Sequence, residues 1–182
     1  FLCGHDERHW FVAAIPESAP VGTVNQAKDA LKPDPVQVAA RQAGLDVGKR
    51  NTRRNEVFVR QGEWFFIPTP TVKVDEKLVL KNEPIRRGRG KPHIVEFCYR
   101  TKGEAVWVNS QHPNGVTFDV YQRIIKQDPK QRFNQMIRDA EVYVRGTVRH
   151  SDHKTITLDG WHRVLMNTES GAAAMRGVAF LD

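Results

Sequence analysis

Three of the seven histidines lie close together in the sequence, between residues 141 and 164. They are His150, His153 and His162. The imidazole ring titrates near neutral pH, so it can act as a general acid or base, and its neutral form binds metal ions. We therefore name these three as candidate catalytic residues of a His-based or metal-assisted phosphodiesterase or nuclease. The alternative interpretation is a polar turn whose histidines only make local hydrogen bonds.

The spacing of these histidines argues against one shared site. His162 lies beyond the return strand of a predicted hairpin, about 25–30 Å along it at roughly 3.3 Å per residue. His150 and His153, with Asp152, offer only a weak surface site for a metal. The segment 153–156, HKTI, matches a pattern that a paired-histidine phosphodiesterase needs twice, and the second copy is absent. The sequence therefore assigns no metal ligands and predicts no cofactor.

A second candidate site is a basic segment between residues 82 and 93, where glycines interrupt a run of cations. The cations are Arg86, Arg87, Arg89 and Lys91. A flexible, Gly-containing loop exposes backbone N–H groups as well as positive charge, and both suit phosphate oxygens. The segment lacks the spacing of a Walker phosphate-binding loop. The alternative interpretation is an ordinary solvated loop.

The charge balance of the whole chain also favours an anionic partner. Lys and Arg exceed Asp and Glu by 28 to 21, which gives a net charge of +7 and an isoelectric point near 9.6. Such a balance favours phosphate-rich partners. Further candidate cations are Lys49, Arg50, Arg53 and Arg54 in a basic connector, and Arg145 and Arg149 on a strand.

Nucleic-acid binding through phosphate contacts is therefore our first prediction, with DNA and RNA not distinguished. The phosphodiesterase or nuclease is the second. The third is a structural or assembly subunit whose basic loops bind an acidic protein partner. The oligomeric state is left open.

The alternating pattern of residues 141–164 predicts a β-hairpin that would position these side chains. A connection of odd length, residues 151–153, places Val148 opposite Ile156 and keeps the apolar residues on one face. It also places Arg145 opposite Asp159.

Three other segments predict strands. Residues 56–67 form a hairpin with Gln61-Gly62 as its turn, which places Phe58 opposite Phe65. Its aromatic residues are assigned to a core covered on both faces rather than to base stacking. Residues 94–109 form a hairpin across 101–103, and residues 9–15 form a short buried strand.

Helices are predicted where caps and apolar spacing coincide. The segments are 23–31, 34–44 and 116–126, with a fourth helix beginning at Asp128-Pro129. The sum is an α+β fold in one domain, residues 1–182. We expect a bent antiparallel sheet or partly closed barrel built from hairpins, with about four short helices packed on it.

Cysteine content and hydropathy exclude other classes of protein. Only Cys3 and Cys98 occur, which is no disulfide framework and favours the cytoplasm. No apolar run approaches the roughly 20 residues of a membrane span. The sequence contains no Gly-x-Ser-x-Gly nucleophile motif and no dinucleotide fingerprint.

Replacement of the four cations at positions 86, 87, 89 and 91 by Gln tests the first prediction. Binding to mixed DNA and RNA should weaken, and its dependence on salt should flatten, because fewer counterions are released. A titration at two salt concentrations measures both effects. Unchanged binding would show that this loop is not the site.

Overall fold

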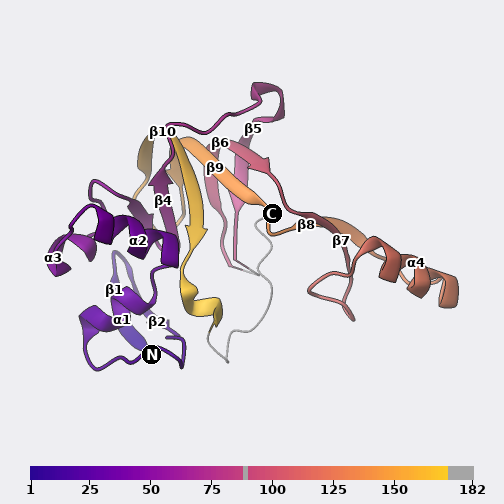
Figure 1. Ribbon diagram of the computed structural model, residues 1–182, viewed down its shortest axis with the longest axis horizontal. Coiled ribbons are helices and arrows are strands. Elements are labelled where there is room, and N and C mark those ends of the chain that lie inside the picture. Colours follow the sequence, from indigo (N-terminus) through magenta and orange to yellow (C-terminus); the bar gives the residue numbers. More distant parts are fainter. Residues whose placement is uncertain (88–89, 172–182) are drawn as a thin grey trace.

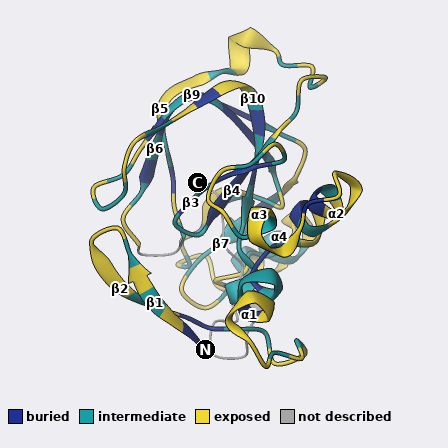
Figure 2. Cartoon of the chain, turned by 90° about the vertical axis from the view of Figure 1, so that its left-hand side faces the viewer, coloured by how far each residue is buried: buried dark blue, intermediate teal, exposed yellow. Residues whose placement is uncertain are grey.

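A six-stranded antiparallel sheet forms the body of the molecule (Figure 1). The structure is a computed structural model that describes residues 1–87 and 90–171. In order across the sheet, the strands are β3 (Val59–Gln61), β4 (Trp64–Pro68), β10 (Ile156–Met166), β9 (Glu141–Arg149), β6 (His93–Thr101) and β5 (Leu80–Ile85). The sheet curves strongly without closing into a barrel (Figure 2). With two smaller sheets and four α-helices in the described residues, the fold is α+β, as predicted.

The main core lies on one face of this sheet. On β9, Val142, Val144 and Val148 are fully buried, because alternate side chains of a strand point to the same face. The side chains that complete this cluster are Val59, Trp64, Phe66, Ile85, Val95, Cys98, Leu158 and Val164. The other face of β4 is covered too, since Phe65 packs with Phe58 and Val36. The prediction that this strand is buried on both faces is confirmed.

The tip of the β9–β10 hairpin has the predicted register. Val148 lies opposite Ile156, and Gly146 lies opposite Leu158. The connecting loop therefore begins at residue 150, where the two candidate histidines are found.

Beyond the tip, the same hairpin departs from the prediction. The register shifts between Leu158 and His162, at a bulge that contains a glycine with positive φ. The expected pairing of Arg145 with Asp159 is therefore wrong. The guanidinium of Arg145 instead lies 4.8 Å from the ring centroid of Trp161.

The β3–β4 hairpin forms where predicted, but its turn is one residue later. Gln61 pairs with Trp64, and Arg60 pairs with Phe65, so the turn residues are Gly62 and Glu63. Gly62 has a φ of +57°, which a glycine adopts without steric cost. The predicted register, with Gly62 as the second turn residue, is wrong by this one step.

A separate arm projects from the body on one side (Figure 1). It contains β7 (Glu104–Val108), β8 (Asn134–Arg138) and α4 (Phe118–Gln127). The helix at 116–126 is thus confirmed. The predicted hairpin within 94–109 is wrong, because β7 pairs with β8 and β6 pairs with β5 and β9.

The helix predicted after Asp128 is also wrong, because that segment contributes β8. The apolar spacing of Phe133, Met136 and Ile137 fitted a helix, but Met136 and Ile137 lie in ladder positions opposite β7. Phe133 packs instead by its ring edge on Tyr121 of α4. Tertiary contacts with β7 and α4 override the local spacing.

The N-terminal part packs a hairpin and helices beside the sheet. The hairpin strands are β1 (Leu2–Asp6) and β2 (His9–Ala13), and the helices are α1 (Val24–Ala30), α2 (Asp34–Gln42) and α3 (Val47–Arg50). The Thr23 hydroxyl accepts a hydrogen bond from the Gln26 amide at 3.2 Å, so the predicted cap is confirmed. Strand β2 is not buried as predicted, since Trp10 is 81% exposed. A two-stranded hairpin buries only the face that packs on α1.

Two further predictions concern the basic segment and the end of the chain. The basic segment between the strands is shorter than the expected 82–93, because β5 ends at Ile85 and β6 begins at His93, and residues 88–89 lie outside the described residues. The sequence GVAFL, residues 177–181, also predicts a strand, but it lies outside the described residues. Among the described residues, no helix has the length and hydropathy needed to cross a membrane.

Two glycine substitutions in the β9–β10 hairpin should differ in their effect on stability. A Cβ at Gly146 would lie 2.5 Å from Glu96 Oε2, which accepts hydrogen bonds from Thr147 N and Oγ1 at 2.8 and 3.0 Å. Gly146→Ala should therefore both strain the backbone and break these hydrogen bonds. Together these effects should lower the free energy of unfolding by about 2–4 kcal/mol.

Gly160→Ala is the matched control for Gly146→Ala. Its φ of +78° is close to the +80° of Gly146, but a Cβ there meets nothing within 4 Å. Gly160→Ala should lower the free energy of unfolding only by the backbone strain, about 1 kcal/mol. Urea denaturation measures both free energies of unfolding, and equal losses would contradict a supporting role for Glu96.

Candidate metal centre

Three histidines, two from one loop and one from a strand end, meet beside the β3–β4 turn. They are His93 at the start of β6, His150 directly after β9, and His153 in the loop before β10. Since Ile94 pairs with Arg149, the next residues, His93 and His150, face each other across the strands. One potential ligand atom from each of the three lies within 4.8 Å of the others.

His93 is the buried member of this cluster. It is 1% exposed, and neither of its ring nitrogens has a hydrogen-bond partner among the described residues. Burial lowers the pKa of His93 to about 3, with further contributions from His150 and His153. The ring is therefore neutral, which is the form that binds metals. A buried polar group without a partner costs about 1–3 kcal/mol, so a missing ligand is an economical explanation.

His153 presents one ring nitrogen to the same space. A Cβ built on Gly62 would lie 3.0 Å from His153 Nε2 and 3.5 Å from His93 Nε2. The two Nε2 atoms therefore face a common point next to this glycine. On the other side of the ring, His153 Nδ1 is 3.7 Å from Glu7 Oε2. A carboxylate behind a histidine is the usual outer partner of a metal ligand.

His150 is the most engaged of the three rings. Its Nδ1 accepts a hydrogen bond from the Asp152 amide at 3.1 Å. Burial and the nearby His153 lower the pKa of His150, while Asp152, the backbone of Lys91 and Glu63 act in the opposite direction. His150 also forms a hydrogen bond with the backbone of Lys91. To bind a metal ion, His150 would have to break either this bond or the one from Asp152.

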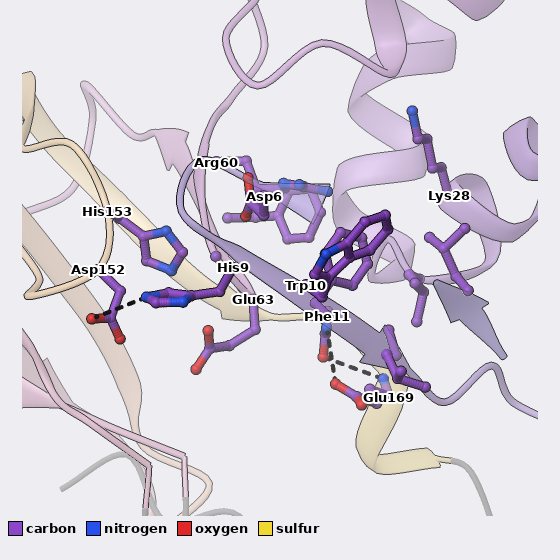
Figure 3. Close-up of a pocket in the computed structure, with 17 residues that line it drawn as sticks. Asp6, His9, Trp10, Phe11, Lys28, Arg60, Glu63, Asp152, His153 and Glu169 are labelled. Carbon is purple, nitrogen blue, oxygen red and sulfur yellow. Dashed lines mark hydrogen bonds and ion pairs between the residues drawn. The ribbon is translucent and has the colours of Figure 1, made fainter. Parts of the chain in front are cut away.

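A pocket of about 300 Å³ opens beside one member of the cluster, His153 (Figure 3). It lies between the β1–β2 hairpin, α1 and the β3–β4 turn, and His153 and Gly62 form part of its wall. Figure 3 shows His9, Glu63, Asp152 and His153 together on one side. The Asp152 carboxylate pairs with Lys91 at 2.9 Å.

Glu63 differs from the other acids of the pocket. Among the described residues, no hydrogen bond or ion pair engages its carboxylate, which is half-buried at the turn. Its charge raises the pKa of His150, so it lies near the cluster. An unpaired carboxylate near His150 can act as a general base.

His162 does not join this cluster. It lies on β10 opposite Val144, is 5% exposed, and its Nδ1 is 3.0 Å from the Gly160 carbonyl oxygen. It lines a different and more open hollow with Arg54 and Phe58. The structure thus brings together two of the three predicted histidines and adds His93. A catalytic role for His162 stays a prediction.

Five of the ten predicted nucleic-acid-binding cations form ion pairs with acids of the same chain. Ion pairs join Arg50 to Asp29, Arg53 to Asp6 and Glu7, Arg87 to Glu169, Lys91 to Asp152 and Arg145 to Glu76. Arg54 donates to the Thr157 carbonyl and Arg149 to the Asn82 side chain. For Lys49 and Arg86, no carboxylate partner is found in the part of the chain that is described. Arg89 lies outside that part, and nucleic-acid binding stays a prediction.

Comparison of the chain with known protein families, with curated proteins and with solved structures found no match. The site is therefore interpreted from its own geometry.

Sequence reasoning missed His93, Gly62 and Glu63. His93 was assigned to the basic loop, and Glu63 to a strand. The signal that identifies His93 is the pairing of Ile94 with Arg149, which joins segments far apart in the sequence.

The low pKa of His93 predicts acid sensitivity. The folded protein resists protonation of His93 down to about pH 3, whereas the unfolded chain takes up this proton near pH 6.5. The free energy of unfolding should therefore fall as the pH drops below about 6.5, by about 2 kcal/mol between pH 7.5 and 5.0 from this residue alone.

Urea denaturation of His93→Leu in the presence of a chelator measures this contribution. The variant should lose less stability than the parent over the same pH range. His5→Leu, at an exposed histidine, is the control and should behave as the parent does. An equal loss in His93→Leu and the parent would contradict the assignment.

Proposed function

We propose that the chain is a metal-assisted hydrolase, with a divalent transition-metal ion bound by His93, His150 and His153. Phosphodiesters are the first substrates to test. The observation that carries the proposal is the buried His93 ring, whose nitrogens have no partner among the described residues and lie near two further imidazoles, one of which, His153, lines a pocket.

Zinc fits this donor set best. Imidazole nitrogen is a preferred ligand of Zn²⁺, and three protein ligands with an open fourth position are typical of catalytic sites. Zn–N bonds of about 2.0–2.1 Å set ligand atoms roughly 3.3 Å apart in a tetrahedron. In the structure the three potential ligand atoms lie within 4.8 Å of one another. The rings would therefore move closer together when the ion binds. His153, in a loop, is the member most free to move.

The open position supports hydrolysis. A zinc-bound water has a pKa near 7 and is a nucleophile at neutral pH. Glu63 would take the proton from this water as its oxygen forms a bond to phosphorus. The bond to the leaving oxygen then breaks, and Glu63 returns the proton to that oxygen. The lack of an ion-pair partner for Glu63 within the described residues leaves its carboxylate available for this role.

Substitution of Gly62 tests the position of the metal. A methyl group at Gly62 would enter the space between His153 Nε2 and His93 Nε2, so Gly62→Ala should weaken zinc binding at least as much as the roughly 10- to 100-fold loss typical of an outer partner. Gly44→Ala is the control, because its φ is +64° and a Cβ there meets nothing within 4 Å.

Calorimetric titration with Zn²⁺ or Co²⁺ measures these affinities. The parent and Gly44→Ala should each bind one ion. A matched histidine pair sharpens the result, since His93→Ala should abolish tight binding and His162→Ala should preserve it. A parent protein that binds no ion would contradict the proposal.

Glu63→Gln separates metal binding from catalysis. Zinc affinity should be retained, because Glu63 is not one of the three ligands. Hydrolysis of bis(p-nitrophenyl) phosphate should fall by about 10²- to 10⁴-fold, the range for loss of a general base. Glu56→Gln, at an exposed acid outside the pocket, is the control. Zinc-loaded parent protein that hydrolyses nothing would overturn the hydrolase and leave the metal site standing.

A further inference from the structure

The pocket contains a second group that lacks a partner, the guanidinium of Arg60. The side chain lines the pocket beside Phe65. Its Nε is buried and has no hydrogen-bond partner, and no ion pair to Arg60 occurs among the described residues. Burial lowers the pKa of Arg60, and the charge of Arg53 acts in the same direction. Among the described residues, no ion pair or side-chain hydrogen bond offsets the desolvation of Arg60.

Unpaired guanidinium groups are rare in protein interiors. Removal of an ion from water costs several kcal/mol, and proteins normally offset this with a carboxylate and further hydrogen bonds. No carboxylate that lines the pocket forms an ion pair with Arg60 among the described residues, and all but Glu63 pair with other cations. Asp6 and Glu169 also line the pocket, but Asp6 pairs with Arg53 and Glu169 pairs with Arg87.

One part of the pocket wall is apolar. Leu2, Phe11, Leu31 and Phe65 contribute to it. Its volume of about 300 Å³ lies at the lower end of the range for small-molecule sites, which are mostly apolar with a few placed polar groups. A ligand that matches this wall has a compact hydrocarbon part and one negative group.

We propose that this pocket binds a small organic anion, whose carboxylate or phosphate accepts paired hydrogen bonds from Arg60 while its apolar part lies against Phe11 and Leu31. A planar guanidinium binds such oxyanions in a bidentate manner. The site for the anion stands on Arg60 and the pocket alone. A second statement rests on the proposed function: because His153 lines the same pocket, the bound anion is the substrate of the metal centre.

Calorimetry on chelator-treated protein tests the anion site without metal. The probes are 3-phenylpropionate, phenyl phosphate and the neutral 3-phenylpropionamide. At least one anion should bind, and the amide should bind at least about tenfold more weakly. The two anions distinguish a carboxylate ligand from a phosphate ligand. Equal binding of the amide and both anions, or no binding of any probe, would overturn the proposal.

Arg60→Met tests the residue. It should weaken anion binding by about 10- to 100-fold, the loss expected for a charged hydrogen-bond donor. Arg41→Met, at an exposed arginine of α2 outside the pocket, should bind as the parent does. Undiminished anion binding by Arg60→Met would also overturn the proposal.

Stability distinguishes a binding role from a structural one. Since Arg60 has no partner to lose, the unfolding temperature of Arg60→Met should stay within about 2 °C of the parent or rise. The opposite result would be a much larger fall in the unfolding temperature of Arg60→Met, while Arg60→Lys and refolded Arg60→Met still bind the anion. That result would show that Arg60 stabilises the fold and does not bind the anion.

Repeating the titration with zinc-loaded protein tests the second statement. Anion affinity should change on metal loading in the parent and not in Gly62→Ala. If zinc does not bind at all, the proposed function fails, while the chelator experiment still decides the anion site. If zinc binds and the affinity is unchanged, the anion is not the substrate of the metal centre.

Discussion

The antiparallel pairing of β6 with β9 is the constraint on which the candidate site depends. Ile94 opposite Arg149 sets the first residue of one strand, His93, against the first residue after the other, His150. A slip of one residue would turn His93 to the opposite face of the sheet. The buried apolar set on β9, with Val142, Val144 and Val148, holds the register because any slip exposes it. The core therefore positions the polar cluster.

The turn between β3 and β4 has a comparable effect on the pocket. With Gly62 first in the turn, Arg60 pairs with Phe65 and enters the pocket wall, and Glu63 occupies the turn beside the histidines. A Cβ there would lie 3.0 Å from His153 Nε2 and 3.5 Å from His93 Nε2, so a larger residue would crowd the two rings. The residue that permits the tight turn is thus also the one that leaves room at the cluster.

Charge pairing decides which polar groups of the pocket are available. Arginines 53 and 87 and Lys91 bind Asp6, Glu169 and Asp152, respectively. The same contacts reduce the free positive charge that the basic composition suggested. In the described part of the pocket, two cations, Arg60 and Lys28, and one carboxylate, Glu63, remain without an ion-pair partner. Net charge counts residues, whereas binding depends on which of them the fold leaves unpaired.

The sequence alone determined the α+β class, the tip register of the β9–β10 hairpin, the caps of α1 and the helix α4, because each follows from local periodicity and capping. It also indicated His150 and His153, which are close in the chain. Only the tertiary structure decided that β7 pairs with β8, that His93 rather than His162 completes the cluster, and that Glu63 and Arg60 face one pocket. These features depend on pairing between segments distant in the sequence, and side-chain alternation is the same whichever partner strand is chosen.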